Sequence, residues 1–126
     1  MVYEVTSTKD LAGIDAALRE SAAAHQFGII HVHNLKETMR SKGVDFAGEC
    51  LIYEVCNPHQ AKIVLEANGA VSTALPCRIS VYKEGGVYKV ATLKPTAILS
   101  MFAMPELASV AHEVEQVIVA MMHAAE

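Results

Sequence analysis

Clustered positive charge is missing from this sequence. Its 126 residues include 10 Lys and Arg against 14 Asp and Glu, for a formal net charge of −4, and every basic residue stands alone. Surfaces that bind nucleic acids or anionic membranes require several Lys or Arg close together. We therefore expect neither nucleic-acid partners nor membrane partners.

A secretion signal, a membrane span and a cysteine framework are missing as well. The N-terminal segment MVYEVTSTKD has no basic region and no apolar region, so it does not resemble a signal peptide. No apolar run approaches the ~18 residues of a membrane span. The three cysteines are an odd number and form no Cys-x-x-Cys motif, which argues against a disulfide framework or a zinc ribbon. We expect reduced thiols and a cytoplasmic location.

The common motifs of enzymes and phosphate-binding loops are also lacking. The sequence has no Gly-x-Gly-x-x-Gly or Gly-x-x-x-x-Gly-Lys loop, no Ser-His-Asp arrangement and no pair of carboxylates at a useful spacing. These absences count against enzymes in general. They leave open whether the protein catalyses a reaction, and they assign no cofactor.

Apolar residues dominate what is present. They make up 52% of the chain, against 19% charged residues, which is typical of an ordered domain, here a single one over residues 1–126. The last predicted helix, roughly Pro105 to His123, is apolar over more than one stripe, although one sheet face needs only ~100° of a helix. We therefore predict a two-fold homodimer that forms through this C-terminal helix.

Hydrophobic periodicity predicts an α+β fold with a largely antiparallel sheet. Predicted strands cover 2–6, 29–35, 49–57, 75–83 and 87–93, and predicted helices cover 9–25, 35–44, 58–68, a short stretch from 95, and 105–123. Strands and helices do not strictly alternate, so a doubly wound fold is disfavoured. Ser7 or Thr8 is predicted to cap the first helix, and residues 69–74 (GAVSTA) are predicted to be extended.

Two cysteines frame the helix predicted from Pro58. Cys56 ends one strand and Cys77 begins the next, so antiparallel pairing of these strands would bring both thiols to the same end of the sheet. The start of the helix and Arg78 would both favour a thiolate, and His59 could pair with Cys56. Together with Asn57, these residues form a candidate ligand-binding site. The alternative is that both cysteines are small apolar core residues.

Further candidate ligands lie on two of the predicted strands. His31 and His33 share a strand face, and two imidazoles at this spacing can bind a divalent metal if a third ligand arrives from elsewhere. The alternative is that they are solvent-facing residues between apolar ones. Cys50 lies six residues before Cys56, on the same strand face, which makes it a conceivable third ligand for the cysteine site.

Three motifs resemble a known family. They are the Cys56-Asn57-Pro58 step, the Leu75-Pro76-Cys77 step that leads into Val81-Tyr82, and the Pro105-Glu106-Leu107 step. In these motifs, and over roughly its whole length, the chain resembles the bacterial and archaeal family catalogued as domain of unknown function 302. The family usually has Asn before the last of these prolines, where this chain has Met104, so an Asn cap is absent here.

The resemblance implies a fold but no activity. It implies helices packed on one side of an antiparallel sheet, similar in layout to the TATA-binding-protein class. It does not imply DNA binding, because function depends on sites rather than folds. Three functions remain open. They are a small-molecule or metal-binding module with its site near Cys56 and Cys77, a non-catalytic homodimeric structural or interaction protein, and a thiol-dependent redox or sulfur-transfer enzyme.

Overall fold

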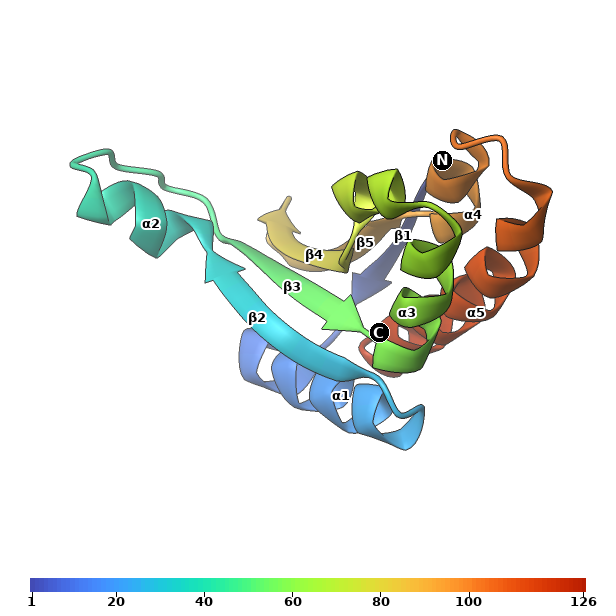
Figure 1. Cartoon of the computed structure of the whole chain (residues 1–126). Helices are drawn as coiled ribbons and strands as arrows, with labels where there is room; N and C mark the ends of the chain where they lie inside the picture. The colour runs from blue at the N-terminus through green and yellow to red at the C-terminus, as the bar shows by residue number, and fades with distance from the viewer.

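A computed structural model describes all residues 1–126 and has the predicted α+β architecture (Figure 1). Five strands and seven helical segments follow one another along the chain: β1 (Val2–Ser7), α1 (Leu11–Ala24), β2 (Gly28–Asn34), α2 (Leu35–Ser41), β3 (Cys50–Cys56), α3 (Pro58–Ala67), η1 (Gly69–Ala74), β4 (Cys77–Glu84), β5 (Val87–Leu93), α4 (Pro95–Ser100), η2 (Pro105–Leu107) and α5 (Ala108–Ala124). The segments η1 and η2 are 3₁₀ helices.

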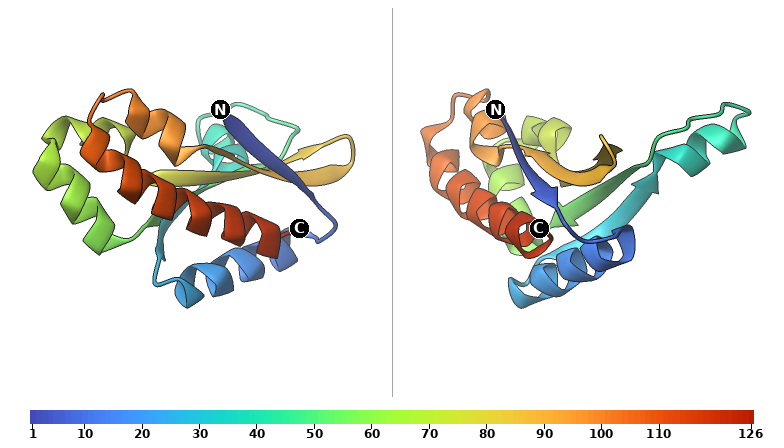
Figure 2. Two further views of the ribbon diagram at one scale, coloured as in Figure 1. Left: turned by 90° about the vertical axis from the view of Figure 1, so that its right-hand side faces the viewer. Right: turned by 180° about the vertical axis from the view of Figure 1, so that it is seen from behind.

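A single sheet organises the fold. Its strand order is β1-β5-β4-β3-β2, and all four pairings are antiparallel. Helices α1 and α5 lie side by side against one face of this sheet (Figure 2). The main core forms between them from Ile14 and Leu18 of α1, Tyr53 and Ile79 of the sheet, and Ile118 of α5. The predicted antiparallel sheet with helices packed on it is therefore confirmed.

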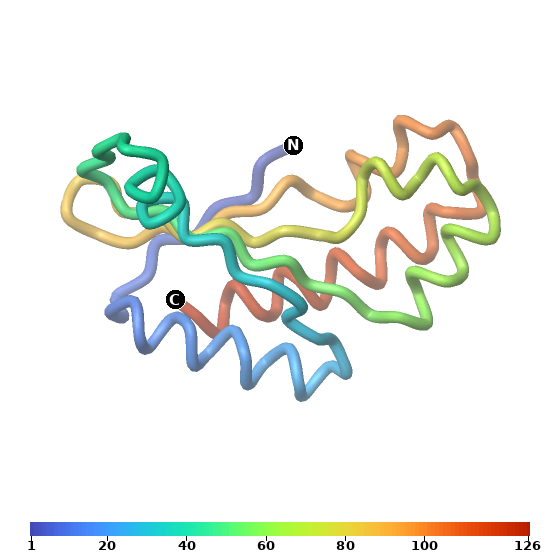
Figure 3. Tube along the Cα trace, turned by 60° about the vertical axis from the view of Figure 1, so that its left-hand side comes forward, coloured from blue at the N-terminus to red at the C-terminus, as the bar shows by residue number.

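A second, smaller core lies beyond one end of the sheet. Figure 3 shows α3, η1, α4 and the start of α5 gathered at this end. Their buried side chains form a cluster of five residues: Val64, Val71, Leu99, Leu107 and Ala111. Because α5 contributes to both cores, its apolar surface is wider than one sheet face requires.

The cap of α1 differs from the prediction. Asp10, rather than Ser7 or Thr8, is the N-cap, and its side chain accepts a hydrogen bond from the N–H of Gly13 at 2.8 Å. Ser7 is buried at the end of β1, where its hydroxyl accepts from the N–H of Lys9 at 3.1 Å, before the helix begins, and donates to the carbonyl of Ala125 at 2.5 Å. The side chain of Ser7 thus attaches the C-terminus of the chain to the sheet.

The segment after α3 is helical, so the prediction of an extended chain there is wrong. Residues 69–74 form η1, whose first turn is capped by Asn68 through a hydrogen bond from the N–H of Ala70 at 2.9 Å. Val71 is fully buried in the second core. A short helix places this side chain inward, and this tertiary contact overrides the weak local preference of a small-residue segment.

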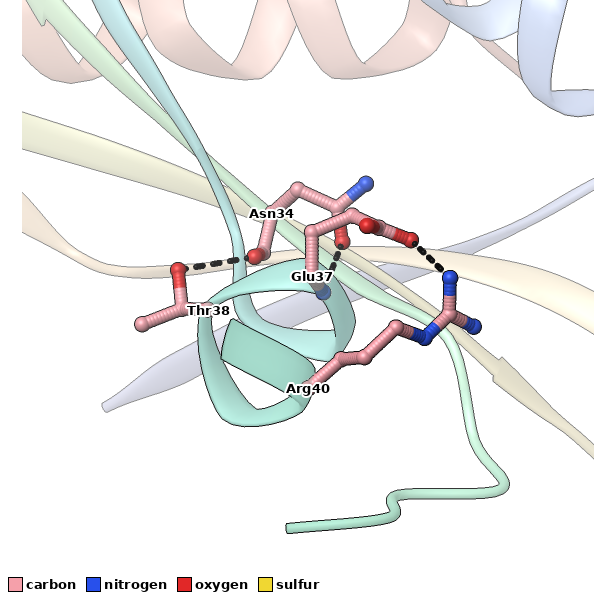
Figure 4. Close-up of polar contacts among 4 residues, drawn as sticks. All are labelled: Asn34, Glu37, Thr38 and Arg40. Carbon is pink, nitrogen blue, oxygen red and sulfur yellow. Dashed lines mark hydrogen bonds and ion pairs between the residues drawn. The ribbon is translucent and has the colours of Figure 1, made fainter. Parts of the chain in front are cut away.

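Helix α2 lies apart from the other helices, at the end of the β2–β3 hairpin (Figure 1). None of its residues is buried, so local polar contacts hold it together (Figure 4). Asn34 caps the helix by accepting from the N–H of Glu37 at 3.2 Å, and Thr38 donates to the carbonyl of Asn34 at 3.0 Å. Arg40 pairs with Glu37 at 3.0 Å.

No helix of the structure has the combination of length and hydropathy needed to span a bilayer.

Candidate functional site

The register of β3 and β4 brings the two framing cysteines together. Val55 of β3 lies directly opposite Cys77 of β4. Paired Cα atoms in an antiparallel sheet are about 5 Å apart, and Cys56 follows Val55 by about 3.8 Å. The Cα atoms of Cys56 and Cys77 are therefore within about 10 Å of each other. The prediction that both residues lie at the same end of the sheet is confirmed.

A hollow of about 310 Å³ opens where these strands meet the second core. We call it the Cys56–Cys77 cavity, because both residues line it. Its wall is built by the ends of β3 and β4, by α3 and η1, and by the first half of α5. Eleven of the fifteen lining residues are hydrophobic, among them Ala61, Val64 and Val110.

Both thiols at this cavity are free and protonated at neutral pH. Burial raises the pKa of Cys77 to about 11; the neighbouring Cys56 raises it further, and Arg78 partly opposes the shift. Burial also raises the pKa of Cys56. The expected thiolate is therefore not favoured, because the loss of water around the sulfur outweighs the helix start and the nearby guanidinium.

The amide side chains at the start of α3 provide the strongest polar groups of the wall. Asn57 caps the helix, and its Oδ1 accepts from the N–H groups of His59 at 3.0 Å and Gln60 at 3.1 Å. Gln60 also lines the cavity and donates from Nε2 to Glu113 of α5 at 3.1 Å. The other amide atom of Gln60, Oε1, is buried and has no hydrogen-bond partner.

Gln60 was absent from the sequence-based candidates, although a signal for it existed. Gln60 and Val64 are four residues apart on a helix, so they lie on one face. Val64 belongs to the apolar stripe of α3, so the sequence already placed a polar side chain on the helix face that turns inward. The long-range partner Glu113, by contrast, could not be inferred from local spacing.

Two of the predicted site residues lie elsewhere. His59 is exposed on the first turn of α3 and does not line the cavity, so the proposed pair of Cys56 and His59 does not form. Arg78 follows Cys77 and therefore points to the opposite face of the sheet. There its guanidinium lies 3.8 Å from the carboxylate of Glu54. Strand alternation separates Arg78 from the cavity.

The histidines of β2 lie on the open face of the sheet, away from the cavity. The ring centroids of His31 and His33 are 4.3 Å apart, and Nε2 of His33 lies 3.1 Å from Oε1 of Glu54. The structure has no group of three or more His, Cys, Asp or Glu side chains suited to hold a metal ion. The structure therefore supplies no complete ligand set for the proposed metal.

Cys50 is too far along β3 to join the cysteine site. Six residues of a strand separate it from Cys56, which corresponds to about 20 Å. Its sulfur instead lies 3.9 Å from the hydroxyl of Ser80. A third ligand from Cys50 is excluded by the length of the strand.

A protein family and a solved structure are similar to this chain over nearly its whole length. No curated protein matches the sequence. A crystal structure of an uncharacterized conserved DUF302 protein from Bacillus stearothermophilus is similar over 99% of this chain and 98% of its own, with 32% sequence identity and a TM-score of 0.93. The model of the family described as "Domain of unknown function DUF302" matches residues 3–125. The chain therefore belongs to the DUF302 family, as its sequence motifs indicated.

Proposed function

We propose that this protein binds a small, largely apolar molecule in the Cys56–Cys77 cavity. The observation that carries the proposal is the cavity itself, about 310 Å³ in volume with eleven hydrophobic residues among fifteen in its wall. Ligand pockets in proteins range upward from about 300 Å³ and combine an apolar wall with a few polar groups. A molecule of two or three fused rings suits this volume.

The composition of the wall supports this proposal. A second hollow, of about 330 Å³, is lined in part by Leu99, Leu107 and Ala111, and six of its nine lining residues are hydrophobic. The Cys56–Cys77 cavity offers a ligand more apolar contacts, since eleven of its lining residues are hydrophobic. Because both cysteines are protonated at neutral pH, they would contact a ligand as weak polar groups of the wall.

The thiol-dependent enzyme is supported less well. A reactive cysteine needs a lowered pKa, whereas burial raises the pKa of both Cys56 and Cys77. His59, which could have activated Cys56, is exposed and does not line the cavity. We therefore favour binding over thiol chemistry.

Binding can be tested with N-phenyl-1-naphthylamine, a probe whose fluorescence increases in apolar surroundings. The Ala61→Phe variant adds a ring to the cavity wall, whereas Ala67→Phe makes the same change at an exposed position of the same helix. We expect saturable binding to the wild type and to Ala67→Phe, and a large loss with Ala61→Phe. Absence of saturable binding, or equal binding to both variants, would contradict the proposal. Native mass spectrometry of the purified protein would reveal a retained ligand.

The homodimer through the C-terminal helix stays a prediction. Its premise was the wide apolar surface of α5, yet Val110 and Val117 pack against the chain's own cores. Five of the seven exposed residues of α5 are polar: Ser109, His112, Glu113, Gln116 and His123. Light scattering at micromolar concentration distinguishes monomer from dimer, and a monomer would refute the prediction.

A further inference from the structure

We infer that this chain forms a two-fold dimer in which the segment Val44-Asp45-Phe46 of each copy occupies a hollow on the open face of its partner's sheet. This interface differs from the one predicted through α5, and it is independent of ligand binding in the Cys56–Cys77 cavity. Two features that have no partner within one chain thereby cover each other between two chains.

The first feature is an arm made of α2 and residues 42–49, which projects from the sheet at the end of the β2–β3 hairpin (Figure 1). Two apolar side chains of this arm, Val44 and Phe46, are 51% and 38% exposed. The arm has local order, because Gly43 adopts a φ of 79° after α2 and the N–H of Val44 donates to the carbonyl of Met39 at 2.9 Å. An ordered arm loses little conformational entropy when it binds.

The second feature is a hollow of about 270 Å³ on the face of the sheet opposite α1 and α5, which we call the open-face hollow. Its strand residues alternate with core residues and therefore point away from these helices: Val2, Ile52, Arg78, Ser80, Ala91 and Leu93. Seven of its twelve lining residues are hydrophobic. Val2 and Leu93 are 63% and 50% exposed, so apolar side chains remain in contact with water there.

The middle of the open face has the composition of a protein interface. Ser80 lies opposite Ala91 of β5 and opposite Ile52 of β3, so the centre consists of small and apolar side chains. Charged side chains surround this centre: Glu4, Glu54, Arg78, Glu84 and Lys89. A sheet face that only meets water is usually polar throughout, whereas an apolar centre with a polar rim is typical of a surface that binds another protein.

The chemistry of the arm matches that of the open-face hollow. Asp45 stands between Val44 and Phe46, and Arg78 is the one charged residue among the twelve that line the hollow. The side chain of Arg78 is 55% exposed, and its guanidinium lies 3.8 Å from Glu54, which leaves it accessible to a second carboxylate. Two apolar side chains and one carboxylate thus meet an apolar wall with a single cation, an arrangement that favours this pairing.

The positions of the two features favour a second copy as the partner. The arm precedes Cys50 at one end of β3, whereas Arg78 lies opposite Glu54 near the other end, and Figure 3 shows α2 and α4 at opposite ends of the sheet. A two-fold axis that crosses the strands between two stacked sheets brings each arm to the hollow of the other copy. Five strands of ordinary spacing and length cover about 500 Å². Two such faces bury on the order of the 1,000 Å² that a specific interface needs, before the arms are counted.

Light scattering and sedimentation at micromolar concentrations test this interface. We expect a wild-type dimer, and we expect Phe46→Asp and Leu93→Asp each to weaken dimerisation by about thirtyfold or more, because the dimer loses an apolar anchor twice. Ile63→Asp is the matched control. It makes a similar change at a side chain of α3 that is 53% exposed and outside the interface, so it should remain as dimeric as the wild type.

A charge exchange distinguishes contact between copies from contact within one copy. Asp45→Arg and Arg78→Asp each place like charges at both arm contacts of a homodimer, so each variant should dimerise about tenfold more weakly than the wild type. An equimolar mixture of the two variants should form a heterodimer, because opposite charges then meet at both contacts.

Three outcomes would overturn the inference. They are a monomeric wild type, a dimer that Phe46→Asp weakens no more than Ile63→Asp does, and a mixture of the charge variants that is no more dimeric than each variant alone. The second outcome would return the interface to α5, and the third would show that the arm does not pair with Arg78 of a second copy. Should Arg78→Asp fold poorly, the comparison of Phe46→Asp with Ile63→Asp is decisive.

Discussion

Removal of the Tyr53 hydroxyl should measurably destabilise the protein. Tyr53 is fully buried in the main core, and its hydroxyl donates to Oδ1 of Asp15 on α1 at 2.7 Å. The other carboxylate oxygen of Asp15 binds Arg19 at 2.9 Å. This small network links β3 to the helix that covers it. The Tyr53→Phe variant removes one hydrogen bond to a charged group and keeps the ring in the core.

The size of the effect follows from the exposure of each partner. Hydrogen bonds to charged groups contribute about 1.5–3 kcal/mol, but the Asp15 side chain is 37% exposed and regains water when the hydroxyl is lost. We therefore expect Tyr53→Phe to lower the free energy of unfolding by about 1–2 kcal/mol. For a domain of this length, such a loss lowers Tm by about 3–8 °C.

The same network predicts a pH dependence. Burial acts to raise the pKa of Asp15, but the hydrogen bonds from Arg19 and Tyr53 outweigh it and hold this pKa below its ordinary value of 3.8. Ionised Asp15 therefore stabilises the folded state above pH 3.8, and this contribution is lost as the pH falls through the lowered pKa. The difference between wild type and Tyr53→Phe should be largest near neutral pH and smaller at about pH 3.

Urea denaturation followed by circular dichroism measures both effects. Tyr82→Phe is the matched control, because the hydroxyl of Tyr82 donates to Glu4 at the solvent-facing side of the sheet, where such a bond contributes less than about 1 kcal/mol. The reasoning is refuted if Tyr53→Phe changes stability no more than Tyr82→Phe does. It is also refuted if the difference from wild type grows as the pH is lowered.

Three further predictions concern the core, a helix cap and the cysteines. Ile118→Ala removes a fully buried side chain and should lower the free energy of unfolding by about 2–5 kcal/mol. The side chain of Ile63 is 53% exposed, so Ile63→Ala should lower it by less than about 0.5 kcal/mol. Urea titrations measure both changes. Asp10→Ala should lower the free energy of unfolding by about 1 kcal/mol, because the cap of α1 is lost, whereas Asp10→Asn should keep most of this stability. Iodoacetamide should modify Cys77 more slowly than Cys56 at pH 7 and faster as the pH approaches the pKa of Cys77, about 11; rapid labelling of Cys77 at neutral pH, seen by mass spectrometry, would contradict this.

The sequence by itself determined the order and type of the five strands and of helices α1 to α5. Alternation of apolar and polar residues identified the strands, because neighbouring side chains of a strand point to opposite faces. Gly85 and Gly86 identified the turn between β4 and β5, and both have positive φ, 61° and 80°, in the structure. Pro58 correctly marked the start of α3. These features depend on a few adjacent residues, so they can be read locally.

The shared position of Cys56 and Cys77 was also predictable, because it followed from one topological inference. Once the two strands are antiparallel neighbours, the end of β3 and the start of β4 must lie side by side, as their register shows. The same rule of alternation could have excluded Arg78, which follows Cys77 directly and so points to the other face. The sequence contained this information, and the candidate site did not use it.

Only the tertiary structure decided the chemistry of the cavity. The raised pKa of Cys77 results from burial, and the orientation of the Gln60 amide depends on Glu113, which lies 53 residues away in the chain. The helical form of residues 69–74 depends likewise on the burial of Val71 in the second core. Burial and long-range hydrogen bonds come from contacts among α3, η1 and α5, and no local pattern encodes which side chains will meet there. The sequence thus specified the strands and the α-helices, whereas the packing between them determined the form of residues 69–74 and which polar atom was left without a partner.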